Sequence, residues 1–185
     1  ETRDRVGDVT VLLNAAGGNS AGVTVTEEQP FEAIDIDAWH DNFALNFDAG
    51  ILHPCREFGP AMVANGRGSI INIASVTSHL PLSRVVTYSA AKAAVLSLSR
   101  FLAREWADKG VRVNTIAPGF ILTDLSRKLW SRPNMRAWAE ANTPQGRLGE
   151  VDDLVGTAIF LSSRASAFMT GQVLRVDGGF TAGVM

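Results

Sequence analysis

Residues 69–110 read SIINIASVTSHLPLSRVVTYSAAKAAVLSLSRFLAREWADKG, and this stretch contains a complete strand-to-helix unit. Its opening run, residues 69–74, is nearly all apolar, which is typical of a strand covered by helices on both faces of its sheet. From Tyr88 to Lys109 the apolar residues recur at helical spacing, and Gly110 follows as a helix-ending residue. The stretch therefore predicts a buried strand, a loop and a long helix.

The same alternation extends to both sides of this unit. Three further runs are also nearly all apolar and predict strands covered by helices on both faces, at residues 9–13, 111–116 and 172–176. Two further helical patterns lie at residues 36–63 and 151–162; the first is one long helix or two consecutive ones, with Asp37 as its N-cap. We therefore expect an α/β fold, a Rossmann-like doubly wound parallel sheet, in a single domain over residues 1–185.

Residues 122–147 give a mixed helical signal that Pro133 and Pro144 interrupt. Because this segment also contains two tryptophans, we interpret it as a flap over a site. At the other end, a charged turn passes at once into the first predicted strand, with no initiator methionine. We therefore expect the sequence to begin inside a larger architecture.

Composition excludes several classes of protein. The 185 residues carry a formal net charge of -2, and their lysines and arginines are scattered, so nucleic acid is not an expected partner. The one cysteine, Cys55, cannot form an internal disulfide, and no His or Cys spacing indicates a metal site. No apolar run approaches the roughly 20 residues of a membrane span. We expect a cytoplasmic protein that does not enter a membrane.

Four polar residues stand where a purely structural account is incomplete. Tyr88 and Lys92 share one face of the predicted long helix, although a solvated lysine over a half-buried tyrosine would look the same. Ser75 follows the strand at residues 69–74, at the edge where open α/β sheets bind ligands, although a turn serine is also common there. Asn46 interrupts an apolar helical face, where an unpaired buried amide costs about 1–3 kcal/mol.

In order and spacing, these residues resemble the Asn-Ser-Tyr-Lys tetrad of the short-chain dehydrogenase/reductase family. Residues 13–17 resemble the family's Asn-Asn-Ala-Gly turn, with Ala15 in place of the second asparagine, and residues 114–123 and 170–179 resemble its Pro-Gly segment and last strand. The resemblance implies NAD or NADP as cofactor. The catalytic residues it implies are Asn46, Ser75, Tyr88 and Lys92. The implied cofactor-binding residues are Asn14, Ala15, Gly17, Tyr88, Lys92, Pro118, Gly119, Ile121 and Thr123.

The chemistry assigns a role to each member of the tetrad. A free tyrosine has a pKa of about 10. An ammonium about 4 Å away would favour the phenolate by about three pKa units, before desolvation is subtracted. We therefore expect Lys92 to lower the pKa of Tyr88, which acts as the general acid-base, while Ser75 holds the substrate oxygen. The resemblance implies that Lys92 also binds the nicotinamide ribose and that Asn46 binds a water linking Lys92 to solvent. For Thr123, a helix-capping role is an equal alternative, and Gly17 could equally be a plain turn glycine.

The wider pattern resembles family members that act on sugar acids, such as mannonate or gluconate oxidoreductases. Arg84 lies between Ser75 and Tyr88, and a guanidinium suits a carboxylate, although it could be a solvated loop residue. His79, Asn19 and Arg147 are further candidates for substrate contacts. We expect an oxidoreductase acting on a secondary alcohol or ketone of a small molecule. The alternatives are a 3-oxoacyl thioester reductase and a non-catalytic binding protein that keeps the fold.

Two further expectations come from the resemblance. The helices around Asn46 and Tyr88 form the family's usual subunit contact, so we expect a homo-oligomer, a dimer or a tetramer. A complete member begins with strands and a Gly-rich turn that binds pyrophosphate, and the sequence lacks both. The residue that separates NAD from NADP lies in that part. We therefore expect residues 1–185 alone to bind the cofactor poorly.

Overall fold

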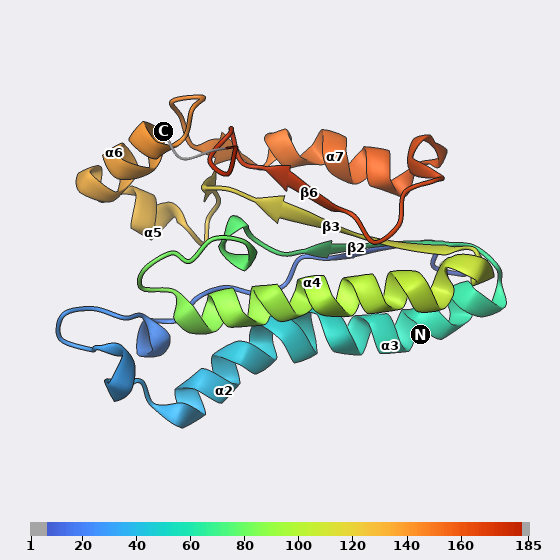
Figure 1. The fold of residues 1–185 in the computed structure, drawn as a ribbon, viewed down its shortest axis with the longest axis horizontal. Coiled ribbons are helices and arrows are strands. Elements are labelled where there is room, and N and C mark those ends of the chain that lie inside the picture. Colours follow the sequence, from blue (N-terminus) through green and yellow to red (C-terminus); the bar gives the residue numbers. More distant parts are fainter. Residues whose placement is uncertain (1–6, 183–185) are drawn as a thin grey trace.

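The computed structural model describes residues 7–182 and contains a four-stranded parallel sheet with the strand order β1-β2-β3-β6. The strands are β1 (Val11–Asn14), β2 (Gly68–Ile73), β3 (Val111–Pro118) and β6 (Val173–Val176). Helices α2 (Ile36–Ala44), α3 (His53–Ala64) and α4 (Val86–Trp106) lie on one side of the sheet, and α7 (Asp152–Ser162) lies on the other (Figure 1). The prediction of a Rossmann-like parallel sheet is confirmed.

Shorter elements complete the chain. A two-stranded sheet joins β4 (Ile121–Leu122) to β5 (Gly149–Glu150), and between them lie α5 (Arg127–Trp130) and α6 (Pro133–Asn142). Single helical turns are η1 (Ala21–Val23), η2 (Phe31–Ala33), η4 (Val76–Ser78), η5 (Ala107–Lys109) and η6 (Arg164–Ser166). The segment that sequence analysis interpreted as a flap therefore contains two helices, which are packed through a cluster that includes Trp130.

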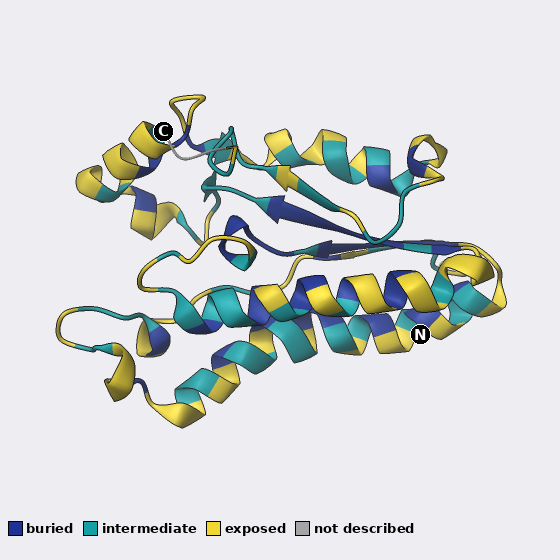
Figure 2. Cartoon of the chain, in the orientation of Figure 1, coloured by how far each residue is buried: buried dark blue, intermediate teal, exposed yellow. Residues whose placement is uncertain are grey.

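The central strand β2 explains why its sequence is almost wholly apolar. Successive side chains of a strand point to opposite faces. Ile70 accordingly packs into the cluster under α3 and α4, with Val95 among its members, whereas Ile71 packs with Leu161 of α7. Burial concentrates on these two faces of the sheet (Figure 2). Helices on both sides are thus the reason that the strand lacks the usual polar alternation.

The outer strand β1 departs from the prediction that all four strands are covered on both faces. Its residues Val11 and Leu13 are 41% and 45% exposed. The reason is position, because β1 lies at one edge of this sheet and pairs with β2 alone. An apolar run therefore identified a strand correctly and its burial incorrectly.

Helix boundaries follow local capping chemistry. The predicted N-cap Asp37 is wrong, because Asp35 caps α2 by accepting the N–H of Ala38 at 2.8 Å. The long helical pattern at residues 36–63 forms α2, the π-helical segment η3 (Leu45–Leu52) and α3 in direct succession. At the end of η5, Gly110 takes a φ of 74°, as expected of a helix-ending glycine.

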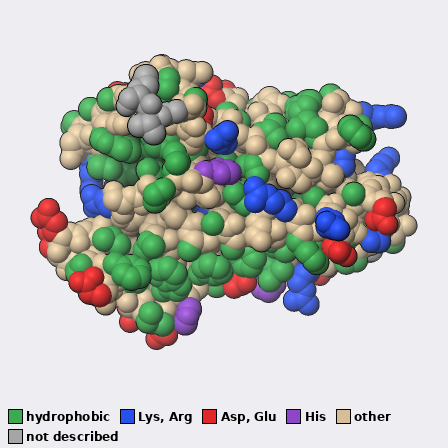
Figure 3. Space-filling view, viewed as in Figure 1, with side chains coloured by type: hydrophobic (Ala, Val, Ile, Leu, Met, Phe, Trp, Pro, Cys, Tyr) green, Lys and Arg blue, Asp and Glu red, His purple; other side chains and the backbone are tan. Residues whose placement is uncertain are grey.

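The surface shows where the described chain leaves apolar side chains uncovered. Hydrophobic side chains gather along the α2–α4 side of the molecule and over α7 (Figure 3). Exposed residues of these elements include Ile36, Phe101, Val155 and Ile159. Within residues 7–182, no helix has the length and apolar character needed to cross a membrane. The same residues contain no group of three or more acidic, His or Cys side chains able to hold a metal ion.

Candidate functional site

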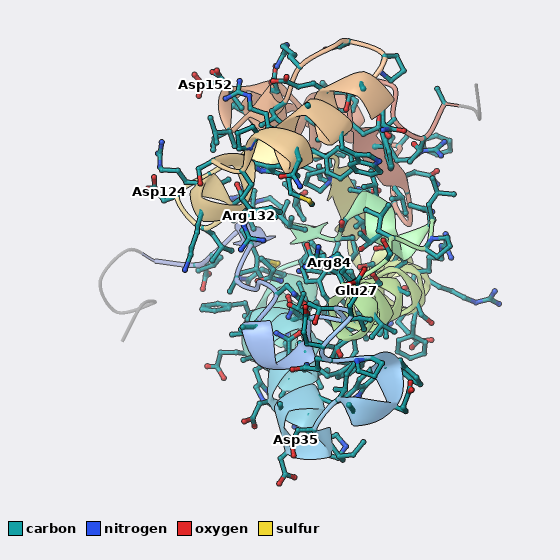
Figure 4. All side chains as sticks on the ribbon, turned by 90° about the vertical axis from the view of Figure 1, so that its left-hand side faces the viewer. Glu27, Asp35, Arg84, Asp124, Arg132 and Asp152 are labelled. Carbon is teal, nitrogen blue, oxygen red and sulfur yellow. The ribbon has the colours of Figure 1, made fainter. Side chains whose placement is uncertain are left out.

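The parallel sheet brings the four tetrad residues to one end of the molecule. Ser75 follows β2 and caps η4, where its hydroxyl accepts the N–H of Thr77 at 3.2 Å. Tyr88 and Lys92 lie in the first turns of α4, and Asn46 lies in η3. Because all strands are parallel, the segments that leave their carboxyl ends share this edge, which faces the viewer in Figure 4.

Asn46 is completely buried, and its amide is hydrogen-bonded at both ends. Its Nδ2 donates to the carbonyls of Gly18 at 2.7 Å and Asn42 at 2.8 Å, while its Oδ1 accepts the N–H of Gly18 at 2.9 Å. Asn46 sits in a π-helical segment, a distortion often found at functional sites. This asparagine therefore holds the turn after β1 against the helix.

Gly17 is the point where that turn approaches the tetrad most closely. Its φ is 142°, and a Cβ placed on it would lie 2.5 Å from Asn46 Oδ1 and 3.2 Å from Lys92 Nζ. The Lys92 ammonium also donates to the carbonyl of Ile73 at 3.0 Å. Only a residue without a side chain can occupy this position. The sequence left Gly17 open between a turn glycine and a site glycine, and close approach is the physical reason for it.

The pKa of Tyr88 shifts in the opposite direction from the one that the sequence analysis predicts. Lys92 Nζ lies 5.6 Å from the centre of the Tyr88 ring. Burial raises the pKa of Tyr88 above its ordinary value, and a hydrogen bond with Ser75 acts in the opposite direction. Burial also lowers the pKa of Lys92 to about 8. The predicted net lowering of the tyrosine pKa is therefore wrong for this structure, because desolvation disfavours the charged form of each group.

Arg84 is held in a strained conformation. It has a φ of 80°, the one positive value of a non-glycine residue within residues 7–182. Its carbonyl accepts the N–H of Val25 at 3.0 Å, which ties the loop before α4 to the loop after η1. Its side chain is exposed and lies, in Figure 4, between the part that carries α2 and the part that carries α5 and α6. Backbone strain of this kind concentrates at functional sites.

Two of the other three candidates for substrate contacts, Arg147 and Asn19, have side-chain hydrogen bonds to nearby residues. Arg147 forms a bidentate ion pair with Asp153, at 2.7 and 2.9 Å. Asn19 donates to Thr24 Oγ1 at 2.7 Å within its own loop. His79 is exposed beside η4; partial burial, followed by the charges of two arginines on α4 and β6, lowers its pKa. Of these predicted residues, Arg84 and His79 have no side-chain hydrogen bond or ion pair among the described residues, and of the two only Arg84 carries a guanidinium.

The segments predicted to bind a cofactor combine structural and open positions. Asn14 is buried, and its Nδ2 donates to Asn72 Oδ1 at 2.9 Å inside the core, whereas Ala15 is exposed. Gly119 packs so closely on the last strand that a Cβ would lie 2.8 Å from Asp177 Cα. Pro118 ends β3 and is partly buried. The side chain of Asn14 therefore serves the fold.

After β3, the backbone is held by a small polar cluster. Ser126 Oγ donates to the carbonyl of Ile121 at 2.7 Å, and the N–H of Ser126 donates to Thr123 Oγ1 at 3.1 Å. Thr123 therefore braces the turn that leads into α5, and the helix-capping alternative is wrong, because the N-cap of α5 is Ser126. A cavity of about 260 Å³ lies beside this segment and is lined by Ile121, Arg147 and Asp177 among others, but by none of the tetrad.

Sequence reasoning missed two residues of the site. Asn42 is buried and donates to the carbonyl of Gly18 at 3.1 Å. Gly18 receives hydrogen bonds from two asparagines, and a Cβ on it would lie 3.0 Å from Leu125 Cδ2. The available signal was spacing, since Asn42 and Asn46 are four residues apart and so share one helical face.

Comparisons with known proteins agree with this arrangement. Residues 1–181 match the family model described as enoyl-(acyl carrier protein) reductase. Gluconate 5-dehydrogenase of Gluconobacter oxydans is 37% identical over 95% of this chain, and galactitol 2-dehydrogenase (L-tagatose-forming) of Cereibacter sphaeroides is 38% identical over 96%. The crystal structure of a gluconate 5-dehydrogenase from Burkholderia cenocepacia, in complex with NADP and tartrate, superposes with a TM-score of 0.89 and 39% identity, and the match covers 98% of this chain and 68% of that one.

The matched relatives are longer than this chain. The chain covers 66% of the Gluconobacter enzyme and 68% of the Cereibacter enzyme. It therefore spans about two thirds of the length of these relatives.

Proposed function

Because this chain belongs to the short-chain dehydrogenase/reductase family, we propose that it carries the catalytic residues of an NAD(P)-dependent oxidoreductase that acts on a secondary alcohol or ketone of a sugar acid or sugar alcohol. The observation that supports the proposal most directly is a chain of contacts at one edge of the parallel sheet: Asn46 and Lys92 lie against Gly17, Lys92 lies by the Tyr88 ring, and Tyr88 shares a hydrogen bond with Ser75. The structural contacts of these residues leave the Tyr88 hydroxyl and part of the Lys92 ammonium available for chemistry.

The residues present fit a nicotinamide cofactor. The missing side chain of Gly17 leaves room for close approach to the backbone after β1. One of the three N–H groups of the Lys92 ammonium donates to the carbonyl of Ile73, so two N–H groups remain for a ribose. The backbone of Ile121 and the hydroxyl of Thr123 lie in the segment that would hold the carboxamide. When bound, the cofactor would accept or donate a hydride at the substrate carbon.

The chain's own residues would move the proton. Ser75 would hold the substrate oxygen, and Tyr88, which already shares a hydrogen bond with Ser75, would take the hydroxyl proton during oxidation and return it during reduction. The raised pKa of Tyr88 keeps the phenol protonated at neutral pH, which suits reduction. A pKa of about 8 for Lys92 lets this amine exchange protons close to neutrality.

A direct test uses the fact that Tyr88 is the only tyrosine in the sequence. Replacing Tyr88 by Phe removes the proton donor without changing the ring, so we expect kcat to fall by about 10²–10⁴-fold with gluconate-type substrates. Ultraviolet titration of the wild-type phenol should report a single ionisation above the ordinary tyrosine pKa. Turnover that survives Tyr88→Phe unchanged contradicts the assignment.

For the substrate, we propose that Arg84 binds the carboxylate of a sugar acid. The exposed guanidinium has no competing ion pair among the described residues, and the fixed backbone orients it. The named relatives include a gluconate 5-dehydrogenase. Arg84→Leu should raise the KM for a sugar acid at least tenfold, as expected for the loss of a charged contact. An unchanged KM removes this proposal.

A matched variant separates the side chain from the strained backbone. Arg84→Gly also removes the guanidinium, but glycine adopts a φ of 80° without strain. Both variants should therefore raise the KM for a sugar acid, and neither should raise the KM for a neutral sugar alcohol, because each variant loses the same carboxylate contact. Equal loss for acids and neutral alcohols would contradict a carboxylate contact.

The 3-oxoacyl thioester reductase remains the second candidate, because the matching family model is described as an acyl carrier protein reductase. A panel of gluconate, galactitol and an acyl thioester, measured with NAD(H) and NADP(H), separates the two and identifies the cofactor.

We further propose a homo-oligomer, since exposed apolar side chains such as Leu45 and Phe101 lie on η3 and α4. We propose a cytoplasmic location on a separate ground, that the one cysteine, Cys55, cannot form an internal disulfide. Light scattering of the purified protein tests the assembly.

A further inference from the structure

A second buried asparagine supports the turn that covers Lys92. Asn42 is 4% exposed and lies on α2, one helical turn before Asn46. Its Nδ2 donates to the Gly18 carbonyl at 3.1 Å and approaches Ser20 Oγ at 3.4 Å. A buried amide in a helix that packs on the core carries a desolvation cost, and here its donors are directed to one loop.

The carbonyl of Gly18 is therefore held by two amides at once. Asn46 Nδ2 donates to it at 2.7 Å, and Asn42 Nδ2 adds the second bond. The two side chains also meet, since Asn46 Nδ2 lies 3.4 Å from Asn42 Oδ1. With both of its lone pairs engaged, this carbonyl fixes the orientation of the peptide group that follows Gly18.

The same turn lies against the ammonium group of the tetrad. A Cβ on Gly17 would lie 3.2 Å from Lys92 Nζ, so the backbone of the turn forms part of the wall that excludes water from this amine. Lys92 is 3% exposed. Anything that loosens the turn should therefore admit water to Lys92.

We propose that Asn42 is a positioning residue, which with Asn46 clamps the Gly17–Ser20 turn over Lys92 and so shields this amine from bulk solvent. The catalytic meaning of the clamp rests on the function proposed above, but the clamp itself does not. Asn42 acts through Gly18, and within residues 7–182 its side chain has no hydrogen bond to Tyr88, Ser75 or Lys92. Asn42 thus influences the environment of Lys92 through the turn, without contacting Lys92 itself.

The test compares Asn42→Leu with Asn114→Leu in the purified protein. Asn114 is also completely buried and also ties loop backbone, donating to the Met169 carbonyl at 2.9 Å and accepting the N–H of Gln172 at 3.1 Å. The two substitutions therefore remove equivalent groups from different regions. Two quantities are measured without substrate: hydrogen exchange of the Gly18 amide, and the NMR titration of Lys92, one of three lysines in the sequence.

We expect Asn42→Leu to speed exchange at Gly18 by about tenfold beyond any change in global stability, because the loop loses a buried hydrogen-bond donor. The same variant should raise the pKa of Lys92 from about 8 toward its ordinary value, since water reaches the amine. Asn114→Leu should change neither quantity, even where it lowers stability. If Asn42→Leu does not fold, Asn42→Ala removes the amide without adding bulk.

Equal Gly18 exchange and equal Lys92 titration in the two variants would overturn the proposal. So would a Lys92 pKa that moves by the same amount in both, because that result would report general loosening. The outcome is independent of turnover: a clamp confirmed in a protein that binds NAD(H) or NADP(H) but has no dehydrogenase activity rejects the proposed function alone. Turnover together with an unchanged Lys92 titration in Asn42→Leu rejects the clamp alone.

Discussion

The carboxyl edge of the sheet carries two regions of opposite construction. The proton corner, formed by Gly17, Asn46, Ser75, Tyr88 and Lys92, is buried or partly buried and held by backbone contacts. The charged rim, formed by Arg84, Arg127, Arg136 and Arg147, is exposed, and three of its four arginines pair with nearby carboxylates.

The difference lies in what each region tolerates. The proton corner is closely packed, so even one added methyl group disturbs its packing. A change in burial there also shifts the pKa of its ionisable groups. On the charged rim, solvent screens each ion pair, so a substitution costs little stability and acts through whatever the side chain binds. Catalysis should depend on the corner, and substrate choice should depend on the rim.

The largest expected effect comes from adding one methyl group to the corner. Gly17→Ala would place a Cβ 2.5 Å from Asn46 Oδ1, at a φ of 142° that side-chain-bearing residues rarely adopt. We expect loss of activity and a large fall in Tm. Gly66→Ala is the control, because Gly66 also has a positive φ, of 63°, but open space around it. Similar Tm losses in both variants would show that backbone strain, and not close approach, makes Gly17 necessary.

An intermediate effect should appear in the pH dependence of stability. The folded pKa of Lys92 is about 8 and its unfolded pKa is 10.5, so between these values the unfolded chain binds more protons. Stability attributable to Lys92 therefore rises as the pH rises from about 8 to about 10.5, and charged Lys92 destabilises the fold below this window.

Lys92→Met removes that dependence. We expect the variant to unfold at higher urea concentration than the wild type at pH 7, with a difference that narrows above pH 8. Denaturant unfolding at a series of pH values measures it. If the wild type instead unfolds at the higher urea concentration at pH 7, the hydrogen bond from Lys92 to Ile73 stabilises the fold by more than the desolvation of Lys92 destabilises it.

The smallest effect is expected on the rim. Arg147→Ala breaks an exposed ion pair with Asp153, and we expect a minor change in Tm and an unchanged KM for the substrate. This result would sharpen the contrast with Arg84. A tenfold rise in KM instead would return Arg147 to the substrate contacts that its sequence position first indicated.

Several features of the site could be predicted from local sequence. The apolar run at residues 69–74, the helical spacing after Tyr88 and the terminating Gly110 each act over a few residues, and all three took the expected form. Features that depend on tertiary contacts were harder to predict. The exposure of β1 and the ion pair of Arg147 depend on which group lies nearby in space. The N-cap of α2 is a local contact between Asp35 and Ala38, and the prediction of Asp37 missed it by two residues.

The sequence by itself determined the order of strands and helices and the identity of the polar residues that follow them, because periodicity and capping are properties of adjacent residues. Only the tertiary structure decided how those residues ionise and which backbone supports them. Burial moved the pKa of Tyr88 upward against the expected effect of Lys92, and Asn42 joined the site through Gly18. Desolvation and hydrogen-bond partnership depend on atoms brought together by folding, which explains why no local pattern could show them.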